Sequence, residues 1–135
     1  MTTFVDTSAF YALLTQEDAR HEVAATWLDT TARDRNETLL THSYVLLETI
    51  SLVHHRQGAA MARLFIENLL PVCEIVFVDE DLHARATIAF LAALGRRPSF
   101  VDRVSFELMR SRDIRRAFAF DPAFARGGFE TVPAL

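Results

Sequence analysis

Residues 4–10 read FVDTSAF, and this stretch decides the fold class. The apolar residues before Asp6 predict a short buried strand over residues 2–5, and those after it predict a helix over residues 8–14. An acid at such a junction can cap the helix with its side-chain oxygen. In a parallel sheet the same position lies at the carboxyl edge of the strands, where open α/β sheets bind ligands. The stretch therefore predicts both an α/β fold and a candidate site.

The rest of the chain repeats this alternation of strand and helix. Strands are predicted over residues 38–41, 74–78, 117–120 and 129–132, and helices over residues 18–33, 44–56, 59–70, 79–94 and 99–112. Such alternation predicts a central, mainly parallel sheet of four to five short strands with helices on both faces, a three-layer α/β/α domain. Ser43 is predicted to cap the helix that begins at residue 44. The length of 135 residues, without a repeat or a linker, predicts one domain over residues 1–135.

Composition excludes several classes of protein. Half of the residues are apolar and 24% are charged, which is not typical of a disordered or a membrane protein. The longest apolar runs fall far short of the roughly 20 residues that span a bilayer, and the first residues show no secretory signal. Cys73 is the only cysteine, so no internal disulfide can form. We therefore expect a cytoplasmic protein without a membrane partner.

The distribution of charge is more informative than its sum. A net charge of -4 ordinarily argues against a nucleic-acid partner. However, all 14 basic residues are arginines, and they are concentrated after Gly95. Arginine is suited to bidentate contacts with phosphate. An acidic chain with an arginine-rich C-terminal third therefore remains compatible with a nucleic acid.

Four acids stand out by their position: Asp6, Glu48, Asp102 and Asp121. Asp6 and Asp121 each follow a predicted strand, and Asp102 lies in the first turn of a predicted helix. Each of these three can also be a helix cap, and capping does not exclude metal binding. Glu48 lies in a strongly apolar helix and shares a mostly apolar face with its neighbours three and four positions away. A carboxylate there needs either an arginine partner or a shared cation.

A divalent cation would explain why several carboxylates converge. Carboxylates placed together repel one another and raise their own pKa values. Mg²⁺, and equally Mn²⁺, prefers such oxygen ligands. A bound ion of this kind can also activate water and stabilise the oxygens of a phosphodiester. The five histidines show no zinc-binding spacing.

Four segments in order resemble the PIN domain family, and most of all the toxin nucleases of VapBC toxin–antitoxin systems. They are residues 4–10, Glu48 in its helix, residues 99–106 (SFVDRVSF) and residues 120–124 (FDPAF). The resemblance extends nearly from end to end and implies a PIN-like fold and a metal-dependent endoribonuclease. One departure is Ala119, where many relatives have a small polar residue two positions before the last acid.

The resemblance also implies roles for individual residues. Asp6 and Asp102 would be direct ligands of Mg²⁺ or Mn²⁺. Glu48 and Asp121 would act through water or complete a second metal position, and Asp121 is the most variable of the four in the family. Ser8 would orient Asp6 or contact the substrate. The expected partners are an RNA substrate, a cognate antitoxin protein and a second copy of the chain in a homodimer.

Arginines near these motifs are candidate contacts to the RNA backbone. Arg103 follows Asp102 directly, and Arg112 and Arg116 precede the fourth predicted strand. Phosphate contacts of this kind position a nucleic acid without specifying its sequence. The alternative is an ordinary solvated surface on which these arginines pair with Glu107 and Asp113.

Other functions remain open at this point. One alternative is a PIN-type nuclease with a housekeeping role in RNA processing, and another is a catalytically inactive PIN-like module that binds RNA or protein. A third is a phosphotransfer enzyme of the haloacid-dehalogenase kind with Asp6 as its nucleophile. That family usually requires a second aspartate where this chain has Ser8, and a lysine, which the chain lacks.

Overall fold

A five-stranded, entirely parallel sheet forms the centre of the computed structural model, which describes residues 1–134. Its strand order is β3-β2-β1-β4-β5. The strands are β1 (Thr2–Val5), β2 (Thr38–His42), β3 (Cys73–Val76), β4 (Arg116–Phe118) and β5 (Glu130–Val132). All four pairings are parallel, so every strand ends at the same edge. The predicted parallel sheet is thus confirmed.

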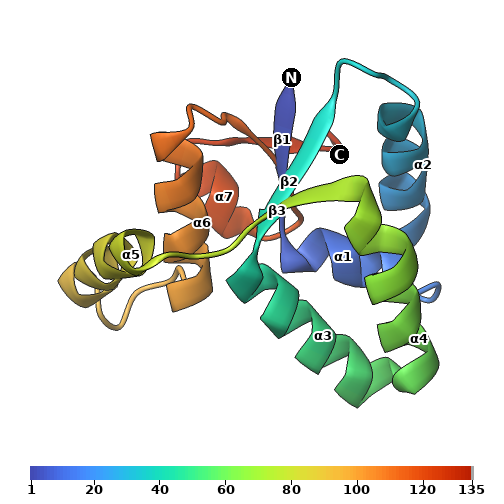
Figure 1. Ribbon diagram of the computed structural model, residues 1–135, viewed down its shortest axis with the longest axis horizontal. Helices are drawn as coiled ribbons and strands as arrows, with labels where there is room; N and C mark the ends of the chain where they lie inside the picture. Colours follow the sequence, from blue (N-terminus) through green and yellow to red (C-terminus); the bar gives the residue numbers. More distant parts are fainter. Residues whose placement is uncertain (135) are drawn as a thin grey trace.

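Helices cover both faces of this sheet, as the alternating pattern predicts. They are α1 (Thr7–Leu14), α2 (His21–Ala32), α3 (Ser43–Gln57), α4 (Ala59–Leu64), α5 (Glu80–Ala92), α6 (Phe100–Ser111) and α7 (Pro122–Arg126). In Figure 1, α5, α6 and α7 lie on one side of the sheet, and α1, α2 and α4 lie on the other. Helix α3 leaves the carboxyl edge of β2. Across residues 1–134, no helix is both long and apolar enough to cross a membrane.

The helix predicted over residues 59–70 is not continuous. It is α-helical only to Leu64 and continues as a π-helical turn (Phe65–Leu69) and a 3₁₀ turn (Leu70–Val72). Phe65 and Leu70 are both buried although they are five positions apart. An α-helix would turn such a pair to different faces, whereas the wider π turn brings both to the core. The ring centroids of Phe65 and Phe10 lie 4.9 Å apart, so the π-helical turn packs against α1.

His42, not Ser43, caps helix α3. The Nδ1 atom of His42 accepts hydrogen bonds from the backbone N–H groups of Tyr44 (3.2 Å) and Val45 (3.3 Å). Ser43 instead accepts a hydrogen bond from the N–H of Val78, at 2.9 Å, and so ties α3 to the chain after β3. The prediction of a Ser43 cap was wrong because the buried ring of His42 reaches the same N–H groups.

His42 also joins β2 to α6. Burial lowers its pKa to about 3, so the ring is neutral. Because Nδ1 accepts hydrogen bonds, the proton lies on Nε2, which donates to Ser105 Oγ at 2.8 Å. The Ser105 hydroxyl in turn donates to the carbonyl of Val101 at 3.1 Å. One buried side chain therefore positions the start of α3 and the first turns of α6.

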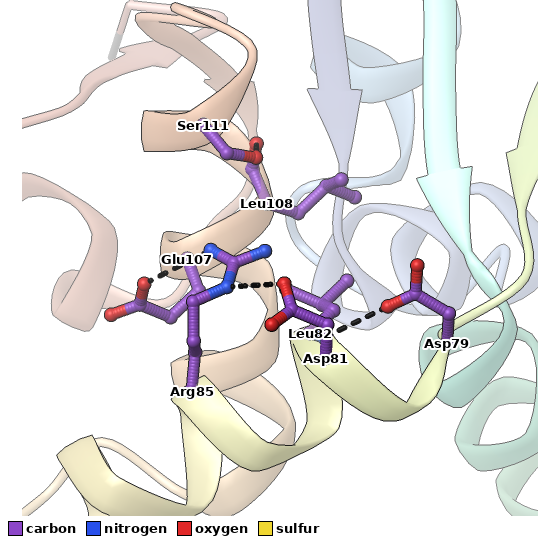
Figure 2. A network of polar contacts seen from close by, with 7 residues as sticks. All are labelled: Asp79, Asp81, Leu82, Arg85, Glu107, Leu108 and Ser111. Carbon is purple, nitrogen blue, oxygen red and sulfur yellow. Dashed lines mark hydrogen bonds and ion pairs between the residues drawn. The ribbon is translucent and has the colours of Figure 1, made fainter.

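Helix α5 is fastened to α6 by polar contacts at the surface (Figure 2). Asp79 caps α5 by accepting from the N–H of Leu82 at 2.8 Å. Arg85 lies 3.0 Å from Asp81 on its own helix and 3.6 Å from Glu107 on α6. Exposed ion pairs contribute little individually. The pair with Glu107 links α5 to the helix that contains Asp102.

Candidate active site

Four carboxylates from distant parts of the chain line one pocket of about 520 Å³. They are the four candidates Asp6, Glu48, Asp102 and Asp121. The pocket lies at the carboxyl edge of the sheet, beside β1. Because β2 and β4 flank β1 on opposite sides, the strand order reverses there, which is where open α/β sheets form their ligand crevice.

Asp6 is the most deeply buried of the four, with 4% of its surface exposed. It follows β1 and caps α1, with Oδ2 accepting from the N–H (3.1 Å) and the hydroxyl (2.7 Å) of Ser8. The pKa of Asp6 is raised to about 7: burial is the largest cause, the charges of Asp102 and Glu48 add to it, and the hydrogen bonds from Ser8 act against it. Helix capping alone does not require a carboxylate to be buried near other acids. Near neutral pH, Asp6 is poised between its protonated and charged forms.

Ser8 connects Asp6 to the segment before Asp121. Its hydroxyl donates to Asp6 and accepts a hydrogen bond from the backbone N–H of Phe120 at 3.0 Å. The hydroxyl thereby orients the carboxylate and fixes the chain beyond β4. Ala119 can offer no polar side chain there, and Ser8 supplies the contact to this segment. Ser8 also lines the pocket, so a substrate contact is compatible with its position.

Asp102 combines a structural role with a place in the pocket. Ser99 Oγ accepts from the N–H of Asp102, and Asp102 Oδ2 accepts from the N–H of Ser99, both at 3.2 Å. This is the capping box that the sequence predicts at the start of α6. Burial is the largest effect that raises the pKa of Asp102, and the charges of Asp121 and Glu48 add to it. Capping therefore holds the carboxylate among the other acids.

Glu48 does not lie on the apolar face of α3. The inward positions of that helix belong to Val45, Thr49 and Val53, at helical spacing. Glu48 is exposed to solvent and lines the pocket from the side, so the expectation of a carboxylate on an apolar face was wrong. Within residues 1–134 it forms no ion pair, so the arginine-partner alternative gains no support. Thr49 donates to Thr7 Oγ at 3.2 Å and fixes this turn of α3 against α1.

Asp121 is half-buried and caps the short helix α7. Its Oδ1 accepts from the N–H of Ala123 at 2.9 Å, and Pro122 occupies the first helical position. The charge of Asp121 contributes to the raised pKa of Asp102, which places the two carboxylates close together. The last of the four acids thus reaches the same pocket as the first.

The donor set has the chemistry that a hard divalent cation requires. All four candidate ligands are carboxylates, and their mutual repulsion is the kind that a cation offsets. In the part of the chain that is described, no three acids, histidines or cysteines form a ready-made cluster of ligands. A cation would therefore take one or two carboxylates directly and complete its shell with water, as Mg²⁺ ordinarily does. Asp6 and Asp102, the two buried acids, are suited to direct contact.

The three candidate arginines lie in different places. Arg103 follows Asp102 on α6 and lines a neighbouring pocket. Arg116 opens β4 at the amino edge, where it pairs with Glu37 at 2.8 Å. Arg112 lies beyond the end of α6 and is 3.9 Å from Glu74. Arg112 and Arg116 therefore do not line the carboxylate pocket, and their contact with the RNA backbone stays a prediction.

Two arginines that we did not predict line the pocket instead. Arg96 and Arg97 lie in the loop between α5 and α6. Their signal in the sequence is the run Gly-Arg-Arg-Pro, residues 95–98, directly before the Ser99 cap. The contact between His42 and Ser105 has no comparable signal in the sequence, because the two residues are 63 positions apart.

Comparison with known proteins is consistent with this arrangement. The family model for the PIN domain matches residues 3–130. The chain belongs to the PIN domain family. Within it, the chain is 37% identical over 132 residues to VapC20 of Mycobacterium tuberculosis, named a 23S rRNA-specific endonuclease, with 96% of each chain covered.

Solved structures of PIN domain proteins resemble the chain closely in fold. The crystal structure of M. tuberculosis VapC20, described as a toxin that cleaves the sarcin–ricin loop, aligns with a TM-score of 0.82 at 34% identity and covers 96% of both chains. VapBC2 from Rickettsia felis, solved bound to a DNA fragment from its promoter, gives 0.72 at 13% identity over 97% of each chain. At that lower identity the likeness shows the fold alone. The predicted PIN-like fold is thereby confirmed.

Proposed function

We propose that this PIN domain is a metal-dependent endoribonuclease and the toxin of a VapBC-type toxin–antitoxin pair. The observation that carries the proposal is the gathering of four carboxylates in one pocket, with the pKa of Asp6 raised to about 7. The 37% identity to a 23S rRNA-specific endonuclease, over nearly the whole of both chains, supports ribosomal RNA as the substrate class. Such a substrate would place the protein in the cytoplasm.

Mg²⁺ is the proposed cofactor, and Mn²⁺ suits the same oxygen ligands. Asp6 and Asp102 would bind the ion directly, while Glu48 and Asp121 would hold its water ligands or complete a second position. When bound, the ion supplies stabilisation of the phosphodiester oxygens and lowers the pKa of a water molecule. The chain itself keeps Asp6 oriented through Ser8 and Asp102 oriented through Ser99.

The direct test is cleavage of 23S rRNA by the purified protein, with cut sites mapped by primer extension. We expect cleavage with Mg²⁺ or Mn²⁺, none with EDTA, and a loss of at least about 100-fold in Asp6→Asn and Asp102→Asn. Glu107→Gln is the matched control, because Glu107 lies on the same helix as Asp102 but pairs with Arg85. Full activity in both aspartate variants would refute the proposal, and so would equal loss in the control.

The toxin assignment is tested in cells. Induced expression of the chain in bacteria should arrest growth, and expression of Asp6→Asn should not. Co-expression of the protein encoded by the neighbouring gene should relieve the arrest and give a complex that co-purifies. Equal growth with both forms would instead favour a housekeeping nuclease or an inactive binding module.

A homodimer is the second proposed assembly. Large apolar side chains are exposed before α5 at Phe77 (73%), on it at Ile88 (70%) and Leu91 (58%), and after it at Leu94 (61%). Burial of these side chains against a second copy would remove them from water. Light scattering after size exclusion should give twice the chain mass, and Ile88→Asp with Leu91→Asp should give the monomer. A wild-type monomer at micromolar concentration would contradict the dimer.

A further inference from the structure

A second pocket adjoins the carboxylate pocket and has the opposite charge. It measures about 220 Å³, and four arginines line it: Arg97, Arg103, Arg110 and Arg126. No acidic residue lines it within residues 1–134. The two pockets share Arg97, Pro98 and Ala123 in their walls, so they are neighbouring parts of one surface.

These arginines lack the partners that arginines on a protein surface often have. None of the four forms an ion pair within the described chain, whereas Arg112, Arg115 and Arg116 at the opposite edge all do. The Nε atom of Arg103 is buried and has no hydrogen-bond partner among residues 1–134. Like charges around one pocket repel. A bound anion would offset this repulsion.

Arg110 is held in place before any ligand arrives. Its guanidinium carbon lies 5.8 Å from the ring centre of Phe106 and 5.4 Å from that of Phe129. Its Nη2 atom also donates to the carbonyl of Gly127 at 3.3 Å. Stacking on aromatic rings leaves the in-plane N–H groups of a guanidinium available. The pocket therefore has at least one ordered donor among its lining residues.

We propose that these four arginines bind a backbone phosphate of the RNA substrate adjacent to the phosphodiester held at the carboxylates. The assignment rests on the endoribonuclease function proposed above. Arginine forks match phosphate oxygens, and Arg110 covers the faces of Phe106 and Phe129, so the pocket offers charge but no free ring for a base to stack on. The shared wall at Arg97 puts this phosphate next to the cleavage site. The contact positions the strand and carries no sequence information.

The test uses a non-cleavable RNA, made with 2′-O-methyl nucleotides, and measures its Kd by fluorescence anisotropy in EDTA. Arg103→Gln and Arg126→Gln should each weaken binding about tenfold, because each removes charge-assisted hydrogen bonds. Each should also reduce the slope of log Kd against log salt by about 0.7, as expected for one lost phosphate contact on a single strand. Arg115→Gln is the matched control, since Arg115 is exposed and pairs with Asp113 away from both pockets.

Unchanged Kd and salt slope in both variants would overturn the phosphate pocket, even if the wild-type protein cleaves RNA. RNA binding without metal is measured separately from cleavage. A wild-type protein that binds RNA through these arginines but does not cleave it would refute the proposed nuclease function and would still support the phosphate pocket. A polyglutamate peptide serves as a second ligand. If it binds as tightly as RNA with the same dependence on Arg103 and Arg126, the pocket recognises carboxylates and the phosphate assignment is wrong. Circular dichroism of each variant checks the fold.

Discussion

Replacing the central acid should make the metal-free protein more stable while abolishing its activity. Asp6 has 4% of its surface exposed, and its folded-state pKa of about 7 lies above the ordinary value of 3.8 for an aspartate. The folded state therefore favours the protonated form. The stability associated with neutral Asp6 is fully present below about pH 4 and is lost as the pH rises through about 7. Asp6→Asn mimics the protonated acid at every pH and can still cap α1.

The size of the effect follows from the shift in pKa. The rise of the pKa from 3.8 to about 7 corresponds to about 4 kcal/mol, which is the largest gain that Asp6→Asn can give above pH 7. At pH 5 the same relation gives less than about 2 kcal/mol. For a chain of this length, about 4 °C in Tm accompanies each kcal/mol, so the variant should melt up to roughly 15 °C higher at pH 8.

The assay is thermal and urea unfolding in EDTA at pH 5 and pH 8. Asp79→Asn is the matched control, because Asp79 also caps a helix but lies at the surface and outside the carboxylate pocket. Added Mg²⁺ should stabilise the wild type and have little effect on Asp6→Asn. A loss of stability in Asp6→Asn at pH 8, or an equal pH-dependent gain in Asp79→Asn, would show that Asp6 acts as an ordinary cap.

Three further variants separate positioning, folding and surface roles. Ser8→Ala removes a hydrogen bond that lowers the pKa of Asp6, so the pH profile of RNA cleavage should move to higher pH. Ser8→Thr should restore the wild-type profile. An unchanged profile in Ser8→Ala would contradict the orienting role of Ser8. His42→Ala removes a helix cap and a buried hydrogen bond, so urea unfolding should show a loss of about 3 kcal/mol, whereas a loss below about 1 kcal/mol would contradict that account. Arg116→Met should cost about 1 kcal/mol in the same assay and leave RNA cleavage unchanged, and a fall in cleavage would return Arg116 to the substrate site.

The sequence predicts the sheet and the positions of the acids where the rules are local. A short apolar strand followed by Asp6, and another followed by Asp121 and Pro122, identify two strand-to-helix junctions without any knowledge of the fold. The spacing of Ser99 and Asp102 likewise identifies a capping box. Parallel pairing then brings the ends of the strands together, so local signals were sufficient to place Asp6 and Asp121 at one edge of the sheet, with Asp102 able to join them.

Local signals fail where the fold separates residues that are close in the sequence, or brings together residues that are far apart in it. Arg116 is five positions before Asp121, yet β4 lies between them and carries the chain across the sheet. Glu48 has apolar neighbours in the sequence, but α3 lies at the open edge and buries only one narrow side. His42 pairs with Ser105 across 63 positions, and no pattern within either segment indicates that contact. Such features depend on tertiary placement, which one sequence does not encode in its periodicity.

The position of β1 has a consequence for the order in which the site can assemble during synthesis. β1 is made long before β4, but it is the middle strand of the sheet, and its partner β4 is formed by residues 116–118. Asp6 also depends on Phe120, through Ser8, for its final orientation. A growing chain that ends before this point has neither Asp121 nor the strand that completes the crevice. A ribosome that makes this protein is therefore exposed to a finished site only after nearly the whole domain has been translated.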